Sequence, residues 1–418
     1  MMIIRILAVF LISLSINLVS YADELSLSSL LERVKSTHPA RKIGEANIKG
    51  AEAQVSAEKT GYLPTLELNA VYTDGFPAGI INLNGIPGAA FRSGPAAGLA
   101  IKQSIWDFGR TSSSVDVAKA DYEVKKAESE VLIDQSAEGV TRDFFECVRL
   151  KEQNRAWTKL KEEFKVVYNQ VQSFVRSGQR SRVEELLAKS QLEDAETRTH
   201  DYDLRLRDVK QRISQILQMN SVQAECPYLG EKTNSKQVSG IQKSNSSLIQ
   251  LAQSEIDLAQ SQVERSKANI RPKLFALASI GMMQNESAGS KNYGVGVGLV
   301  APLFDSFRNK HETEHFKALA QAKEARAQFI NQQLDEVNSR YDENINSSRF
   351  RVQRLTRELD LGLQGLELAK KRYSLMEGKL VDLREAIRNV SQIQSALVDA
   401  RVQYQMNLAL KGILNHQI

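Results

Sequence analysis

The sequence has few cysteines and no long apolar run outside its first residues, and both shortages exclude classes of protein. Only two cysteines occur in 418 residues, Cys147 and Cys226, so a fold held by several disulfides is excluded. We expect both to be unpaired, although a single disulfide between them stays open. Beyond residue 22 no stretch reaches the roughly 20 apolar residues of a membrane-spanning helix. Any insertion into a bilayer must therefore use a β-barrel.

The first residues predict a secretory signal peptide over 1–22. Arg5 precedes the apolar residues 6–19, and Ala22 ends a short stretch that a signal peptidase can read. We expect cleavage after Ala22, and the absence of a following cysteine disfavours a lipid anchor. The formal net charge is only +5, and basic and acidic residues are interleaved along the chain. This pattern indicates solvated helical faces and argues against nucleic-acid binding.

Self-similarity divides the rest of the chain into two structural repeats. They cover residues 23–219 and 244–414, with a linker at 220–243 and a short tail at 415–418. Each repeat reads as a helix, two strands joined by a Gly-rich loop, a very long helix and a return helix. The loop at 76–94 is expected to be an extracellular cap or lid, with a flexible connection as the alternative.

Short motifs recur at the same places in both repeats. Pro64 and Pro272 open the first strand of each repeat, and each long helix is broken at a glycine, Gly178 or Gly378. The second strand of each repeat ends in an aromatic and acidic corner, Trp106-Asp107-Phe108-Gly109-Arg110 or Phe304-Asp305-Ser306-Phe307-Arg308. The repeated order of motifs, more than any one of them, supports the duplication.

The strand segments alternate with period two. In the first strand one face carries Leu66, Leu68, Ala70 and Tyr72, and in the fourth Tyr293, Val295, Val297 and Leu299 alternate with glycines. The other two strands, 97–106 and 273–283, alternate less clearly. Each of the four has about the 9–11 residues that a tilted strand needs to cross a bilayer. An ordinary half-buried antiparallel sheet fits the strands alone equally well.

The helical stretches favour the membrane interpretation. Residues 112–175 and 308–376 contain no proline and little glycine, so each can run roughly 90–100 Å, too far for a globular core. The return helix carries two adjacent apolar rows, one with Leu383, Val390 and Leu397 and one with Ala386, Ile393 and Ala400. Two rows predict neighbours on two sides, as in a ring of helices, with a plain two-stranded coiled coil as the alternative.

Four strands cannot close a barrel, and open sheet edges in lipid leave backbone groups without partners. Several copies must therefore combine their strands, and three copies give twelve, an even number in the range of outer-membrane barrels. We expect a mixed α and β membrane protein, with a twelve-stranded barrel in a trimer and long periplasmic helical hairpins. Such a conduit has no evident place for a catalytic pocket.

These features together resemble the TolC-type outer membrane efflux protein family, over essentially the whole mature chain. The resemblance implies a homotrimer in the outer membrane of a Gram-negative bacterium, with its helices in the periplasm. It implies an exit duct for a tripartite efflux pump or a type I secretion system, working with a periplasmic adaptor and an inner-membrane transporter. It implies no cofactor and no catalysis. The cargo cannot be read from the sequence.

The resemblance also suggests a gate near the second break. Asp382 and Glu385 match acidic residues that line a periplasmic constriction in the family, and Tyr373 matches a tyrosine that can hold it shut. The sequence departs from the family pattern because Arg384 lies between the acids and Gly378 stands where a gate-linking arginine is expected. A solvated acidic surface at a helix start is the alternative.

Residues at both breaks are candidates for contact with the adaptor. The first break is basic, which also fits a plain solvated turn. The candidates are Arg176, Gly178, Arg180, Gly378 and Lys379.

A competing motif is His311-Glu312-Thr313-Glu314-His315, which matches the zinc-protease pattern of two histidines one turn apart and a glutamate base. Glu336 lies at a spacing where a third ligand can occur. Charged neighbours count against a secreted metalloprotease, and so does the lack of histidine in the corresponding segment of the first repeat, residues 112–117. A periplasmic adaptor would have a single hairpin, and a structural coiled coil would lack the strands.

Overall fold

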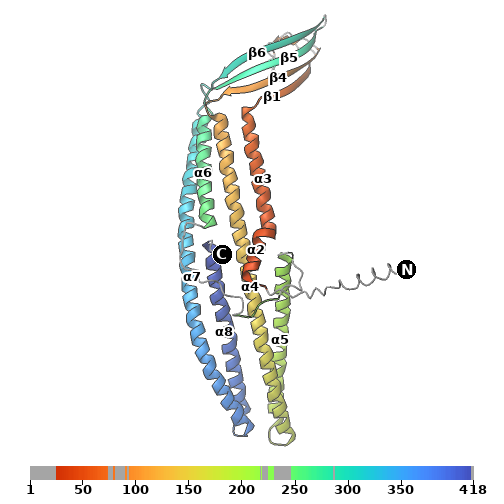
Figure 1. Cartoon of the computed structure of the whole chain (residues 1–418), viewed down its shortest axis with the longest axis vertical. Coiled ribbons are helices and arrows are strands. Elements are labelled where there is room, and N and C mark those ends of the chain that lie inside the picture. Colours follow the sequence, from red (N-terminus) through yellow and green to blue (C-terminus); the bar gives the residue numbers. More distant parts are fainter. Residues whose placement is uncertain are drawn as a thin grey trace, which may run out of the picture.

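The computed structural model describes residues 25–73, 79–80, 90–91, 94–216, 218, 225–229, 246–285 and 288–415. The signal peptide predicted at 1–22, most of the loop at 76–94 and most of the linker at 220–243 lie outside these ranges. The molecule is elongated, with a sheet at one end and helices that run from it to the opposite end (Figure 1). The sheet therefore lies far from the two turns, one between each long helix and its return helix, which we call the tips.

The first repeat contains two entry helices, which correspond to one in the second repeat, then the two strands and a helical hairpin. Its elements are α2 (Leu27–Thr37), α3 (Pro39–Lys59), the 3₁₀ turn η1 (Thr60–Tyr62), β1 (Thr65–Thr73), β4 (Gly94–Trp106), α4 (Arg110–Arg176) and α5 (Arg182–Ile216). Two short strands within the expected loop, β2 (Gly79–Ile80) and β3 (Ala90–Phe91), pair with each other.

The second repeat has the same order of elements. They are α6 (Ser247–Ala268), β5 (Lys273–Asn285), β6 (Ala288–Val300), α7 (Arg308–Ser374) and α8 (Leu380–Leu414). Both long helices have 67 residues, about 100 Å at 1.5 Å per residue, and both return helices have 35 residues. Equal lengths mean that positions counted from the start of each long helix correspond.

The aromatic and acidic corners turn each strand into its long helix. Oδ2 of Asp107 accepts a hydrogen bond from the Thr111 amide at 2.7 Å, and Asp305 does the same for the Asn309 amide at 3.0 Å. Each aspartate thereby satisfies a backbone donor of the first helical turn. The two residues after each aspartate have left-handed backbones, with φ of 91° at Gly109 and 63° at Phe307.

The main sheet is antiparallel with the order β1-β4-β5-β6. Its register aligns Leu68 with Leu99, Leu99 with Ile280 and Ile280 with Tyr293, so one face is apolar across all four strands. The exposed large members of this face are Leu66, Leu68, Tyr72, Leu99, Ile101, Ile280, Met282, Tyr293, Val295, Val297 and Leu299. Within the described sheet, β1 and β6 have a strand on one side only.

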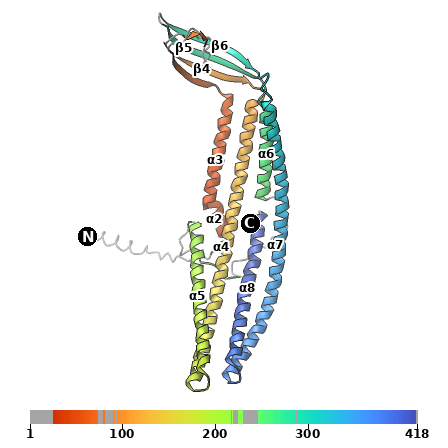
Figure 2. The ribbon, with the colours of Figure 1, turned by 180° about the vertical axis from the view of Figure 1, so that it is seen from behind.

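The helices pack around α4, which contacts α2, α3, α5, α6 and α8. The return helix α8 lies against both α4 and α7, as its two apolar rows predict. Buried members of these rows are Leu383, Val390, Leu397, Ile393 and Ala400. Figure 2 shows the two hairpins side by side at the end far from the sheet. None of the helices in the described ranges is both long and apolar enough to serve as a transmembrane helix.

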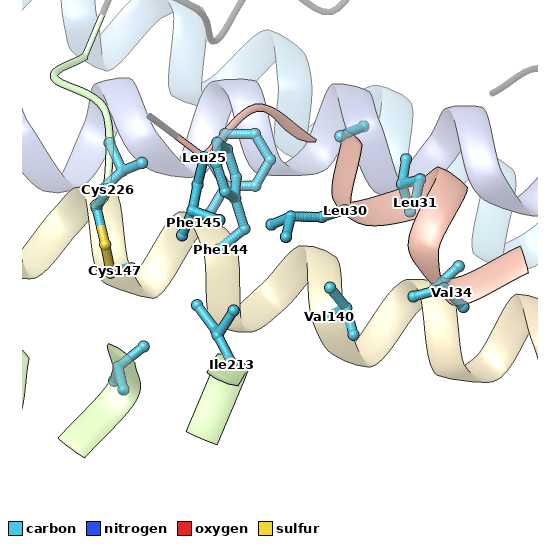
Figure 3. Packing of buried hydrophobic residues seen from close by; sticks show 14 of the residues in the cluster. Leu25, Leu30, Leu31, Val34, Val140, Phe144, Phe145, Cys147, Ile213 and Cys226 are labelled. Carbon is cyan, nitrogen blue, oxygen red and sulfur yellow. A yellow bond between two sulfur atoms is a disulfide. The ribbon is translucent and has the colours of Figure 1, made fainter. Parts of the chain in front are cut away.

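A core cluster includes residues of α2, which lies near the middle of the long axis (Figure 1), and it contains both cysteines (Figure 3). Cys147 on α4 and Cys226 form a disulfide with a Cα–Cα distance of 6.0 Å, so the expectation that they are unpaired was wrong. The segment 225–229 folds back onto α4, where the Leu229 amide donates to Glu152 at 2.9 Å and Glu225 pairs with Lys210 at 2.8 Å. These contacts hold the segment against α4, at a Cα–Cα separation that is usual for a disulfide.

Candidate gate at the helical tips

The two hairpins end in tight turns of the same backbone form. Gly178 and Met376 each lie two residues beyond their long helix, and their φ angles are 75° and 67°. The left-handed position in the second turn is therefore Met376 and not Gly378. Gly378 instead holds the position that Arg180 holds in the first turn. A Cβ at Gly378 would lie 3.1 Å from the Tyr373 amide nitrogen, so close packing against the end of α7 favours glycine there.

The turns are joined by a set of side chains that we call the tip cluster, made of Arg180, Glu184, Tyr373 and Gly378. Tyr373 donates its hydroxyl to Glu184 Oε2 at 3.2 Å. Arg180 donates from Nη2 to the Gly378 carbonyl at 2.7 Å, and its Nη1 lies 3.7 Å from Glu184. Its guanidinium also lies 5.2 Å from the centre of the Tyr373 ring. Two residues of the first hairpin thus hold two of the second.

Tyr373 is the central residue of this cluster because it is completely buried. Its ring lies 6.1 Å from that of Phe174, within an apolar group from all four hairpin helices. Burial, followed by the charge and hydrogen bond of Glu184, raises the pKa of Tyr373 to about 12, and Arg180 acts in the opposite direction. The hydroxyl therefore keeps its proton at physiological pH and acts as a donor to the carboxylate.

The structure does not bring Asp382 and Glu385 to Tyr373. Both lie on the exposed face of α8, and Glu385 pairs with Arg388 at 3.1 Å. The acceptor of the tyrosine is Glu184 instead, which sequence reasoning missed. The repeat carried the signal, since Glu184 is the third residue of α5 and Asp382 is the third residue of α8.

The five candidates for adaptor contact fall into two groups. Arg176, Gly178 and Lys379 are exposed at the ends of the hairpins. Arg180 and Gly378 instead contact each other inside the tip cluster. The first three are therefore accessible to another protein, and the other two hold the hairpins together.

The motif at 311–315 lies on the first turns of α7. The His311 side chain is 71% exposed and lies 3.3 Å from Glu314, and Glu312 pairs with Arg308 at 3.0 Å. Within the described ranges, no group of three or more His, Cys, Asp or Glu side chains could hold a metal ion. The glutamate expected to be the base in a metalloprotease is thus engaged in an ion pair on an open helix surface.

Comparison with solved structures shows the same fold in outer-membrane proteins. VceC of Vibrio cholerae is 17% identical with a TM-score of 0.76, covering 93% of this chain and 96% of that one. The CmeC channel of Campylobacter jejuni is 16% identical with a TM-score of 0.78, covering 95% and 86%. The MtrE channel of Neisseria gonorrhoeae is 16% identical with a TM-score of 0.77, covering 95% and 91%. No curated protein sequence matches.

The fold class expected from the sequence is thereby confirmed, a mixed α and β membrane protein whose four strands complete a barrel only in a trimer. The family model for outer membrane efflux proteins matches residues 30–217 and 240–416. The protease and adaptor alternatives are set aside because both repeats match this family. The protein resides in the Gram-negative outer membrane, with its helical part in the periplasm. The chain belongs to the outer membrane efflux protein family.

Proposed function

We propose that three copies of this chain form the exit duct of a tripartite efflux pump or a type I secretion system. The observation that carries the proposal is the four-stranded sheet, which has an exposed apolar face and an open edge on each side. Lipid can cover the apolar face, but it cannot satisfy the amides of an open edge. Other copies of the chain must therefore close the wall, and the attached hairpins then extend the pore into the periplasm.

The exposed tip residues are the proposed contact with a periplasmic adaptor, which would connect the duct to an inner-membrane transporter. Arg176 and Lys379 place positive charge at the end of the molecule farthest from the sheet (Figure 1). Most charged pairs elsewhere lie within single helices, such as Arg198 with Asp194 and Arg207 with Asp203. Within the described residues Arg176 and Lys379 form no ion pair, so their charge is available to a partner with acidic hairpin ends.

The tip cluster is the proposed lock of the closed duct. Opening requires the second hairpin to move away from the first, which breaks the hydrogen bond from Tyr373 to Glu184 and the one from Arg180 to Gly378. The Glu184 carboxylate is partly buried, so losing its donor is more costly than losing a contact on the surface. Docking of a partner at the tips can offset this cost.

Asp382 and Glu385 are proposed to line the constriction. Threefold symmetry would arrange each residue as a ring of three carboxylates, and such rings attract cations. Their exposure on α8 supports this arrangement because neither side chain is committed to the hairpin core.

Site-specific photo-crosslinking in cells tests the proposed partners. A crosslinker at Lys379 is expected to capture a periplasmic protein with a long helical hairpin, and an inner-membrane transporter is expected to co-purify with that complex. A crosslinker at Lys119, which is 58% exposed but close to the sheet, is the matched control. Equal capture of the hairpin protein at both positions, or no capture at Lys379 during active export, would contradict docking at the tips.

A further inference from the structure

The two repeats meet inside the chain, where β4 pairs with β5 and α4 lies against α6. Two arginines join the repeats below the sheet. Arg110, the first residue of α4, donates from Nη2 to the Asn269 carbonyl at the end of α6. Arg271 donates from Nη1 to the Phe108 carbonyl at 2.8 Å. We call this region the internal junction.

The second repeat presents the same corner with no repeat beyond it. Arg308 is the first residue of α7, as Arg110 is the first of α4. In both corners an aspartate caps the helix and two left-handed residues follow it. Arg308 nevertheless lies with its side chain 81% exposed, and it reaches only the Glu312 carboxylate one turn along its own helix.

The counterpart of the Asn269 carbonyl belongs to Gly61. The helices α3 and α6 end in the same way, since the Leu63 amide donates to the Thr60 carbonyl at 2.8 Å and the Arg271 amide to the Ala268 carbonyl at 3.1 Å. A proline follows each turn and opens a strand. Helix α3, which ends just before Gly61, lies on the side of α4 away from α7 (Figures 1 and 2), so Arg308 cannot reach Gly61 within one chain.

We infer that Arg308 donates a hydrogen bond to the backbone carbonyl of Gly61 in the next copy of the chain, which reproduces the internal junction between copies. The inference rests on the proposed assembly, in which β6 of one copy pairs with β1 of the next. Around such a ring, the order α3, α4, α6, α7 continues with α3 of the following copy. Arg308 then meets Gly61 as Arg110 meets Asn269.

The strand register supports this equivalence independently. Ile101 lies opposite Ala278 and Leu99 opposite Ile280 at the internal junction. The corner aspartates align β4 with β6, and the strand-opening prolines align β5 with β1. With this alignment, the junction between copies has Leu299 opposite Ala70 and Val297 opposite Tyr72. All four side chains belong to the apolar face, whereas a shift of one residue would place apolar side chains on the opposite face.

The junction between copies has fewer polar contacts than the internal one. Leu63 takes the place of Arg271, so the contact to the Phe108 carbonyl has no counterpart. Of the two arginines that join the repeats inside the chain, only Arg110 has a counterpart between copies, and that counterpart is Arg308. An interface carbonyl that loses its donor stays unsatisfied unless water reaches it.

Cysteine pairs test the assembly and arginine variants test the contact. The double variant A70C/L299C is expected to give covalent trimers on mild oxidation, and Y72C/L299C, displaced by two residues, is expected to give few. The native cysteines do not interfere because they are already joined. R308A is expected to lower the temperature at which the trimer dissociates on a gel by several degrees. R308K should recover part of the loss. K310A, which removes a neighbouring exposed charge, is the control and should leave the dissociation temperature unchanged.

The outcomes separate the two claims. Covalent trimers from A70C/L299C together with an unchanged dissociation temperature for R308A would overturn the role of Arg308 and leave the trimer intact. Equal loss in R308A and K310A would overturn it as well. A wild-type protein that forms no trimer would overturn the proposed function itself.

Discussion

The hydroxyl of Tyr373 connects the two hairpins, so its removal is the most direct perturbation of the proposed lock. Y373F keeps the buried ring against Phe174 and removes only the donor to Glu184. A hydrogen bond to a charged acceptor contributes about 1.5–3 kcal/mol. Losing it should therefore shift the closed-to-open equilibrium toward the open state by about 10- to 150-fold in each copy, at 1.4 kcal/mol per factor of ten.

The assay is single-channel recording in planar lipid bilayers. Y373F is expected to raise the open fraction or the mean conductance. Y168F is the matched control because the Tyr168 hydroxyl contacts only Gln172 on its own helix, at 3.1 Å. The double variant Y373F/E184Q should open less than the sum of the two single changes predicts, since both remove the same hydrogen bond while E184Q also weakens the pair with Arg180. Equal conductance in Y373F, Y168F and wild type would refute the lock.

Burial of Tyr373, together with the charge and hydrogen bond of Glu184, sets the pH dependence of the closed state. The pKa of Tyr373 is raised to about 12 in the folded protein from its usual value near 10. A raised pKa means that the neutral tyrosine stabilises the closed state fully below about pH 10, and the contribution is lost as the pH rises through about 12. The open fraction should therefore be insensitive to this tyrosine across physiological pH.

Three further predictions concern the gate acids, the disulfide and the sheet. Neutralising Asp382 and Glu385 together should raise conductance for large ions or weaken cation preference, and unchanged selectivity would remove them from the constriction. Reducing the disulfide, which closes 79 residues of sequence, should lower stability by up to about 4–5 kcal/mol, measured as a lower unfolding temperature in reductant. V295R, at a side chain 86% exposed on the apolar face, should cost about 2–4 kcal/mol per copy and reduce membrane insertion. S279R on the opposite face is its control, and equal loss in both variants would contradict the assignment of the lipid face.

The sequence could predict the architecture because its signals were periodic and repeated. Alternation in the fourth strand identified Val295 and Val297 as one face, and the absence of proline gave both long helices almost to their ends. The two apolar rows of α8 predicted neighbours on two sides. Each of these signals is local, and each is strengthened by its occurrence in both repeats.

The contacts between distant segments could not be predicted in the same way. Cys147 and Cys226 show no spacing motif, because the pairing depends on how the segment 225–229 returns to α4. The partner of Tyr373 lies 189 residues away in the other hairpin. The glycines at the two breaks suggested an alignment that is two residues out of register, because the second turn uses Met376 for its left-handed position.

The mass of the purified particle tests the central claim most directly, namely that separate copies complete one wall in the membrane. Native mass spectrometry or light scattering of the detergent-extracted protein should give three chains per particle, which separate only on heating. A particle with one chain that stays dispersed without detergent would contradict the account.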